Sequence, residues 1–468
     1  MGTVHPHVNS RARAAFKTVL HEGKFWRLDH PELKVDATLR LSKRGAVKLN
    51  IPSTAPDQLG SYGTTRSGHA LGQLSDSRPV TLWGDPNMDF VWHNRSRRTQ
   101  EWSTAIINAH VGIEQETVFT SSSLTFDGID TWSRMPRAIR QDEPRAKYES
   151  AVIEDVYGTG VRVSVTIDSA AVAEKLLDGN LQFIRFLGED GRIRFETDSP
   201  TSLSFHRRLW FDLKSLLSFS LQREVYMFDF QAVLPGGGVV SVIERREEEP
   251  GGLLYEKQMI LTPGHTPPEK LFPSWWKAVD ALFPVAQVIV GRHYAQKAYL
   301  EGTAIAAFGA AEALHKHLGF NQLRFSRPFF KKATEELKLT LERPKQSPEQ
   351  EDFEMFLSEV LQNVSPFRTR LRELGESAGA SQLRAADIDV KTWIDITAGV
   401  RNKIAHSGSN VKRRGNTEDQ LDLANHGTRV VLSMILRNYV SESPLSPKQA
   451  SEIFLHTRWK LLPKSHES

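Results

Sequence analysis

Apolar and polar residues alternate with a period of two from about residue 23 to residue 283, in short runs broken by turn residues. Residues 161–167 (VRVSVTI) alternate strictly, as a strand with one buried face does. The runs at 181–186 and 191–195 flank Glu189-Asp190-Gly191, which predicts a hairpin. Further strands are expected at 37–41, 47–51, 117–120, 226–232 and 239–243. Many short strands without alternating long helices predict a sandwich- or barrel-like β-rich part of one or two subdomains.

The apolar spacing changes to three and four residues after Pro284. Residues 285–318 predict one long helix, and Thr417-Glu-Asp-Gln420 is a capping box that opens another. Further helices are expected at 352–364, 367–374, 387–405 and 450–461. Short connections between them predict an all-α bundle. The expected fold is therefore α+β and multidomain, with a flexible segment at 1–22, a β-rich domain at 23–285 and a helical domain at 286–468.

Composition narrows the class of protein. The chain has 468 residues, 39% of them hydrophobic, and no cysteine, which excludes disulfides, thiolate metal sites and cysteine nucleophiles. It has no apolar run long enough to span a membrane and no apolar core of signal-peptide type near Met1. A soluble cytoplasmic protein without membrane partners is therefore expected.

The excess of basic over acidic residues lies in the helical half. Residues 286–468 carry 26 Lys and Arg against 21 Asp and Glu. Residues 401–414 contain no acidic residue and five basic ones: Arg401, Lys403, Lys412, Arg413 and Arg414. Such a stretch attracts phosphates, although a solvated loop has the same composition.

Arg401 and His406 stand five residues apart in this stretch. Arginine offers a fixed cation for a phosphate, and histidine offers a base near neutral pH. RNA carries its own nucleophile, the 2′-OH, so these two groups suffice in principle for cleavage without a metal ion. His406 followed by Ser407-Gly408 is equally compatible with a simple helix C-terminus.

Other chemical motifs are weak. Glu312-Ala-Leu-His315 has the E-x-x-H spacing of di-iron bundles, but such sites need two copies and the sequence has one. The chain contains neither H-E-x-x-H nor G-x-S-x-G, and no G-K-[ST] follows its glycine runs. We therefore expect no metal and no cofactor.

The helical half resembles the HEPN superfamily, whose nucleases carry an arginine, usually a polar residue, and then a histidine. Arg401, Asn402 and His406 match this pattern. An upstream helix of the family often carries a glutamate followed four residues later by a basic residue. Glu312 and Lys316 match this spacing. The resemblance implies a metal-independent endoribonuclease in which His406 is the base and Arg401 stabilises the phosphate, with Glu312 and Lys316 in support. Lys403, Lys412, Arg413 and Arg414 would bind RNA.

The β-rich half is similar to the N-terminal part of ApeA-like HEPN proteins. The similarity rests on Phe25-Trp26 before the strand pair 35–41 and 47–51, on residues 121–132 (SSSLTFDGIDTW) and on residues 210–219 (WFDLKSLLSF). It implies anti-phage defence by abortive infection, with the N-terminal domain sensing a phage-derived trigger or restraining the nuclease. It also implies a homodimer through the HEPN domain, which would bring two Arg-His motifs to one cleft.

Two alternatives compete with the ribonuclease. The helical domain could bind RNA or a protein without cutting. The β-rich domain could instead bind a carbohydrate or protein and carry an incidental helical tail. Support for the second alternative comes from four tryptophans, although tryptophan more often anchors a core: Trp83, Trp92, Trp102 and Trp132.

Overall fold

The chain folds into two compact units, residues Met1–Trp276 and Lys277–Ser468. The computed structural model describes residues 18–42, 45–52, 68–84, 91–92, 97–133, 151–168, 172–178, 181–187, 192–244, 259–294, 299–320, 325–341, 365–406 and 415–454. Residues 1–17 of the expected flexible segment lie outside this part of the chain.

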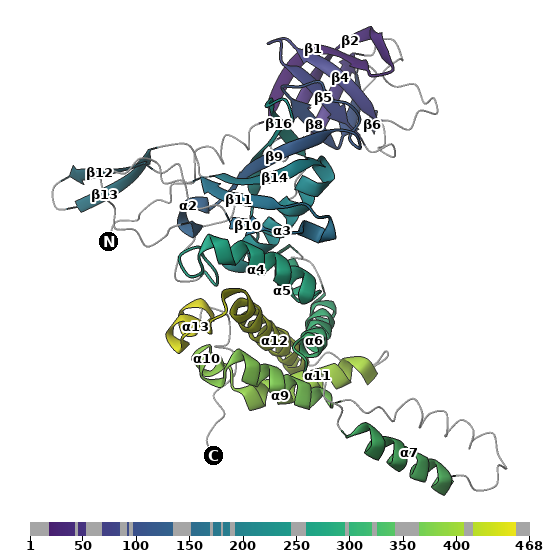
Figure 1. The fold of residues 1–468 in the computed structure, drawn as a ribbon, viewed down its shortest axis with the longest axis vertical. Helices are drawn as coiled ribbons and strands as arrows, with labels where there is room; N and C mark the ends of the chain where they lie inside the picture. The colour runs from purple at the N-terminus through teal and green to yellow at the C-terminus, as the bar shows by residue number, and fades with distance from the viewer. Residues whose placement is uncertain are drawn as a thin grey trace. The chain divides into compact units, whose positions relative to one another are not determined.

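The N-terminal unit is built on one large antiparallel sheet (Figure 1). Its strand order is β10-β11-β14-β9-β15-β16-β8-β5-β4-β1-β2-β3-β7-β6, and β12 and β13 form a separate pair. The strands are β1 (Val19–Arg27), β2 (His30–Leu41), β3 (Val47–Pro52), β4 (His69–Leu74), β5 (Pro79–Trp83), β6 (Val91–Trp92), β7 (Arg97–Trp102), β8 (Thr104–Ile107), β9 (Val118–Phe126), β10 (Ala151–Ile153), β11 (Val163–Asp168), β12 (Val172–Asp178), β13 (Leu181–Leu187), β14 (Arg192–Ser202), β15 (Met227–Val233) and β16 (Val239–Glu244).

Strands β1 to β5 and β8 enclose the first core of this unit. Alternate residues of β2 and β3, among them Leu39 and Leu49, are buried on one face, as the period-two pattern predicts. Phe25 of β1 lies against Gly72 of β4, where a Cβ would meet the ring at 2.4 Å. Only glycine fits this position without a shift of the ring, so the close approach of β1 and β4 requires it.

Helix α3 (Leu203–Leu221) covers strands β9 and β14. It begins where β14 ends, with the Ser202 hydroxyl accepting a hydrogen bond from the Phe205 amide at 3.4 Å. Trp210 Nε1 donates to Ser122 Oγ of β9 at 3.0 Å, and the same hydroxyl lies 2.9 Å from His206 Nδ1. The helix is thereby fixed to the sheet by a buried polar contact as well as by its apolar face.

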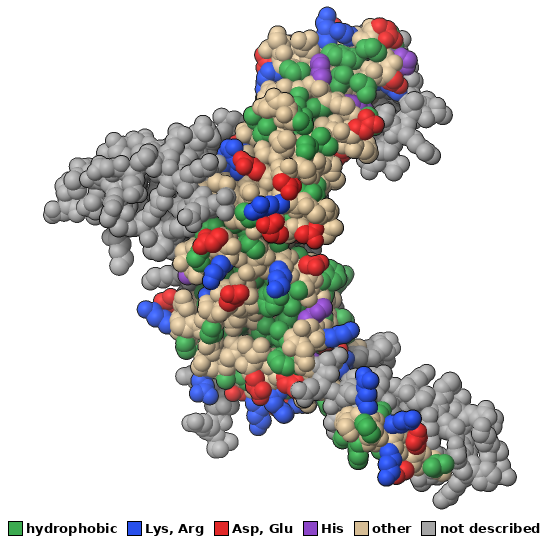
Figure 2. All heavy atoms as spheres, viewed as in Figure 1, with side chains coloured by type: hydrophobic (Ala, Val, Ile, Leu, Met, Phe, Trp, Pro, Cys, Tyr) green, Lys and Arg blue, Asp and Glu red, His purple; other side chains and the backbone are tan. Residues whose placement is uncertain are grey.

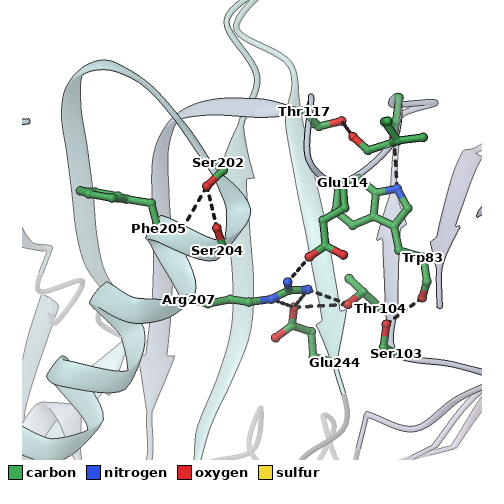
Figure 3. Close-up of polar contacts among 12 residues, drawn as sticks. Trp83, Ser103, Thr104, Glu114, Thr117, Ser202, Ser204, Phe205, Arg207 and Glu244 are labelled. Atoms are coloured by element: carbon green, nitrogen blue, oxygen red, sulfur yellow. Dashed lines mark hydrogen bonds and ion pairs between the residues drawn. The ribbon is translucent and has the colours of Figure 1, made fainter. Parts of the chain in front are cut away.

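Arg207 of α3 ties the helix to two other strands (Figure 3). Its Nε donates to Glu244 Oε1 of β16 at 2.6 Å, and its Nη2 donates to Thr104 Oγ1 of β8 at 2.8 Å. Glu114 pairs with the same guanidinium. This half-buried arginine, with its two carboxylate partners, therefore joins α3 to the neighbouring strands β16 and β8.

Tryptophans of this unit anchor its cores. Trp83 and Trp132 are buried, and Trp132 Nε1 donates to the Leu261 carbonyl at 3.0 Å. Trp275 Nε1 donates to the Asp212 carbonyl at 3.1 Å. Buried indoles with satisfied N–H groups are packing elements and present no face for a sugar. Trp132 is the last residue of the short helix α2 (Ile129–Trp132), and Trp275 lies in α4 (Pro268–Ala281). A 3₁₀ turn, η2 (Val156–Gly158), follows β10.

The C-terminal unit is helical, as the spacing predicts. A core between α6, α11 and α12 contains Phe308, Val400 and Leu421, with Ile396 and Ile404 packed against it. None of the helices in the described residues is long and apolar enough to cross a membrane. The helices are α5 (Val285–Tyr294), α6 (Leu300–His317), α7 (Arg327–Leu341), α9 (Phe367–Ala378), α10 (Ala380–Ala385), α11 (Val390–His406), α12 (Gly415–Ser441) and α13 (Pro447–Phe454).

The fold class is therefore α+β, but two local predictions are wrong. The run 181–186 does not pair with 191–195: β13 pairs with β12, and β14 pairs with β11 and β9. Two residues of turn-forming type, Gly179 and Asn180, separate β12 from β13 in the sequence, as expected of a two-residue hairpin connection. The expected long helix over 285–318 is two helices, because Tyr299 has an extended backbone before α6. The helix expected at 352–364, and residues 455–461 of the one expected at 450–461, lie outside the described residues.

Candidate functional site

Helix α11 carries Arg401 and His406 in its last two turns. The helix begins beside Asp389, whose carboxylate accepts a hydrogen bond from the Thr392 amide at 2.8 Å. A hydrogen bond from the Thr392 side chain, and then the one from its amide, lower the pKa of Asp389. The apolar face of α11 packs on α6 and α12 through Val400. Arg401 follows directly, and its side chain is directed to Glu312 on α6.

The Glu312 carboxylate holds two guanidinium groups. Oε1 accepts from Arg401 Nη2 at 3.0 Å, and Oε2 accepts from Arg370 Nη1 of α9 at 3.3 Å. Arg370 is held further by its Nε, which donates to the Ser365 carbonyl at 2.8 Å. Three helices therefore meet at one carboxylate.

Arg401 is positioned on two sides. Its guanidinium carbon lies over the Phe367 ring, 4.7 Å from the ring centroid, while its Nη2 binds Glu312. The Arg401 side chain remains 42% exposed, against 31% for Glu312. An ion pair whose side chains are this exposed to solvent contributes little to the stability of the fold. Its main effect is to fix the orientation of an accessible cation.

The other motif residues are placed around this centre. Asn402 and Lys403 are exposed on α11, and Lys403 Nζ donates to Gln420 Oε1 of α12 at 3.3 Å. Lys316 is exposed on α6, one turn beyond Glu312. His406 is the last residue of α11, and its side chain lies outside the part of the chain that the structure describes. Lys412, Arg413 and Arg414 lie outside it altogether.

Two residues of the site were not expected from the sequence. Arg370 and Phe367 belong to α9, whose apolar residues Leu371 and Leu374 predicted a helix but not its neighbour. The signal was local: an arginine on the polar face of an amphipathic helix, three residues after an aromatic. Nothing in that pattern indicates that Glu312, 58 residues earlier, is the partner.

The E-x-x-H pair of α6 is engaged by α9. His315 Nε2 of α6 binds the Glu373 carboxylate of α9. One turn earlier on both helices, Glu312 of α6 binds Arg370 of α9. The Glu312 oxygens therefore face guanidinium groups. Among the described residues no three His, Asp or Glu side chains are grouped so that they could hold a metal ion.

A cleft of ≈600 Å³ opens on another side of α9. Figure 2 shows basic and acidic side chains side by side over α9 and α10. A surface of mixed sign does not select an anion, so this cleft is a weaker candidate for a phosphate backbone than the Arg401 centre. The charged residues that line it are Arg368, Arg372, Arg384, Lys391, Asp387, Asp389 and Asp395.

The comparison with protein families concerns the other unit. A family model described as ApeA N-terminal domain 1 matches residues 21–288, more than half of the chain. The match ends before α6 and so does not include Glu312, Arg401 or His406. No curated protein and no solved structure matches the chain. On the strength of the family match, the chain belongs to the ApeA family and is an ApeA-like anti-phage defence protein.

Proposed function

We propose that this defence protein is a metal-independent endoribonuclease of the HEPN type, acting in the cytoplasm by abortive infection. The observation that supports the proposal is the Arg401 centre: a guanidinium held by Glu312 and Phe367 that still presents much of its surface to solvent. An arginine has five N–H donors in a planar fork, and the contact with Glu312 is made by Nη2. The other donors can bind a phosphate.

The proposed reaction uses the ribose 2′-OH as nucleophile. His406 removes the 2′-OH proton, the oxygen attacks the adjacent phosphorus, and the bond to the 5′-oxygen breaks. Arg401 stabilises the extra negative charge on the phosphorane-like transition state. The departing 5′-oxygen takes a proton from water, and His406 releases to solvent the proton that it removed, so the products are a 2′,3′-cyclic phosphate and a 5′-hydroxyl. Asn402 would position the phosphate.

Binding of RNA would rely on the remaining basic residues of this region. Lys403 is exposed on α11, two residues after Arg401, and we assign Lys412, Arg413 and Arg414 to the same role on sequence grounds. Each phosphate contact adds affinity that falls with salt concentration. Glu312 then has two effects: it orients Arg401, and it neutralises the cation until a phosphate competes for it.

We further propose a homodimer through the helical unit and a regulatory role for the β-rich unit. In a regular helix, residues five apart point about 140° away from each other, so Arg401 and His406 of one chain do not converge on one phosphate. Two chains related by symmetry can supply the two groups to one cleft. The ApeA N-terminal domain would then sense a phage-derived trigger and restrain or release that cleft.

Labelled single-stranded RNA incubated with the full chain in excess EDTA tests the proposal. Cleavage to fragments with 2′,3′-cyclic phosphate ends supports the nuclease. Retention of uncut RNA supports the alternative of a non-catalytic RNA-binding protein. Cleavage to 3′-hydroxyl ends, equal cutting of DNA, or no interaction would contradict both.

A further inference from the structure

Helices α5 and α12 contact each other in the helical unit (Figure 1). They carry a second group of basic side chains. Arg292 and His293 end α5. His426 and Arg429 are three residues apart on α12, and so share a face. Arg292 is exposed, the two histidines are half-buried, and Arg429 is 6% exposed. The group therefore runs from solvent to a buried guanidinium.

Arg429 has unused hydrogen-bonding capacity in this buried position. Its Nε donates to Asn425 Oδ1 at 2.9 Å, and Asn425 Nδ2 donates to Thr303 Oγ1 of α6 at 3.2 Å. These bonds fix the side chain. Its Nη1 is buried and has no hydrogen-bond partner. A buried charged donor without an acceptor is costly, because it has lost its water and gained nothing in return.

The electrostatic environment of the group is positive. Burial and then the charges of Arg292 and Arg429 lower the pKa of His293 and of His426 to about 4. Burial and then Arg292 lower the pKa of Arg429 to about 10, against the opposing effect of Asp422. Both histidines are therefore neutral at pH 7, so the positive charges of this group are those of Arg292 and Arg429, and a bound anion would reduce the repulsion between these two.

We propose that Arg292, His293, His426 and Arg429 form a binding site for a phosphoryl group. A phosphate offers several acceptor oxygens, one for the unpaired Nη1 of Arg429 and others for Arg292 and the imidazoles. Its negative charge offsets the repulsion between Arg292 and Arg429.

This site is distinct from the Arg401 centre. Thr303, which anchors Arg429 through Asn425, precedes Glu312 by nine residues on α6, a rise of about 13 Å along the helix. The proposal does not depend on the nuclease proposal, because it predicts binding and not cleavage. The phosphoryl group could belong to a small phosphate monoester or to the backbone of an RNA strand. Both share the chemistry that the site recognises.

Thermal unfolding of the full chain with three probes tests the proposal: inorganic phosphate, AMP and a short oligoribonucleotide, each at constant ionic strength set with sodium chloride. The test variant is Arg429→Met, which keeps the length of the side chain and removes its charge. The matched control is Arg437→Met on the same helix. Arg437 is also buried and has one unpaired donor, its Nε, but its Nη1 donates to the Ser443 carbonyl.

At least one probe should raise the Tm of the parent and of Arg437→Met by about 2 °C or more. Arg429→Met should not respond. Response to phosphate and AMP alone identifies a monoester site, and response to the oligoribonucleotide identifies a backbone site. Equal shifts in the parent and Arg429→Met, or no response of the parent to any probe, would overturn the proposal.

A second variant covers the case that Arg429→Met does not fold. Arg292→Gln changes an exposed residue, so it should leave the fold intact. We expect it to weaken binding of the responding probe about tenfold in calorimetric titration, because it removes one of the two permanent charges. Unchanged affinity in Arg292→Gln would count against the site.

Discussion

Arg401 of α11 and Glu312 of α6 are 89 residues apart in sequence, and their side chains meet with Nη2 and Oε1 3.0 Å apart. The same carboxylate binds Arg370 of α9 through its other oxygen. One acidic residue thus sets the geometry of the cation on which the proposed nuclease depends. Because the Glu312 side chain is 31% exposed, the arrangement bears on activity more than on stability.

Substitution of Glu312 tests this positioning role. Glu312→Gln keeps the shape of the side chain but removes the charge that holds both arginines. We expect RNA cleavage to fall about tenfold or more and the free energy of unfolding to fall by no more than about 1 kcal/mol. The matched control is Glu301→Gln on the exposed first turn of α6, which should keep the parent rate. Equal rates for the two variants would show that Glu312 does not act through Arg401.

Substitution of Arg401 by lysine separates charge from geometry. Lysine keeps the positive charge but loses the planar group that lies over the Phe367 ring and binds Glu312 through Nη2. We expect Arg401→Lys to cleave RNA at least about tenfold more slowly than the parent, and Arg401→Ala at least about 10²-fold. Single-turnover cleavage rates measure both effects. Arg372→Ala, a change of an exposed arginine on α9, is the control that should leave the rate unaltered. A parent-like rate for Arg401→Lys would mean that charge alone suffices.

The pattern of apolar residues predicted the helices of this site but not their contacts. Trp393, Ile396, Val400 and Ile404 share one face of α11, and three of them join the core with α6 and α12. That face fixes where Arg401 points. The partners Arg370 and Phe367 could not be predicted, because their distance from Glu312 is set by the tertiary packing of α9. The regulatory role expected for the β-rich half likewise rests on its resemblance to ApeA-like proteins, because no chemical motif in its residues indicates that role.

Strand pairing shows the same limit. The turn-forming residues Glu189-Asp190-Gly191 indicated a local hairpin, yet β14 pairs with β11 and β9. In the sheet, Phe195 lies opposite Val165 and both are buried. Burial of this face on the large sheet stabilises β14 more than a hairpin with β13 would. The pairing of β14 is therefore determined by packing on the large sheet and not by the local turn residues.

The buried His206 makes stability depend on pH. Its pKa is lowered from 6.5 to about 4, because burial beside Ser122 disfavours the charged imidazole. Above pH 6.5 the residue is neutral in both the folded and the unfolded chain. Between pH 6.5 and 4 the unfolded chain binds a proton that the folded chain does not, so stability falls as pH falls. The expected contribution is a loss of about 2 kcal/mol by pH 5.

Urea unfolding at pH 7 and at pH 5 measures this contribution. His206→Asn retains an amide near the position of Nδ1 and does not titrate, so the difference in stability between the two pH values should shrink relative to the parent. The comparison is internal to each protein and tolerates a lower absolute stability of the variant. An unchanged pH difference would show that His206 is not the titrating group.

The proposed composite site requires two chains. Sedimentation of the full chain at micromolar concentration should therefore show a dimer. Mixing inactive Arg401→Ala with inactive His406→Ala chains should restore some cleavage, since a mixed dimer assembles one intact pair of groups. A monomer in sedimentation, together with RNA cleavage by that monomer, would contradict the two-chain site.

The most direct test of the central claim is the rate of RNA cleavage by His406→Ala in EDTA, measured beside His317→Ala, a control on the exposed end of α6. We expect His406→Ala to be slower than the parent by about 10² or more, with little change in Tm, and His317→Ala to match the parent. Asn402→Ala should be milder, because an amide neither moves a proton nor carries charge. The double variant Arg401→Ala/His406→Ala should be little slower than the slower single variant. If His406→Ala cuts RNA at the parent rate, the assignment of Arg401 and His406 as the catalytic pair is wrong.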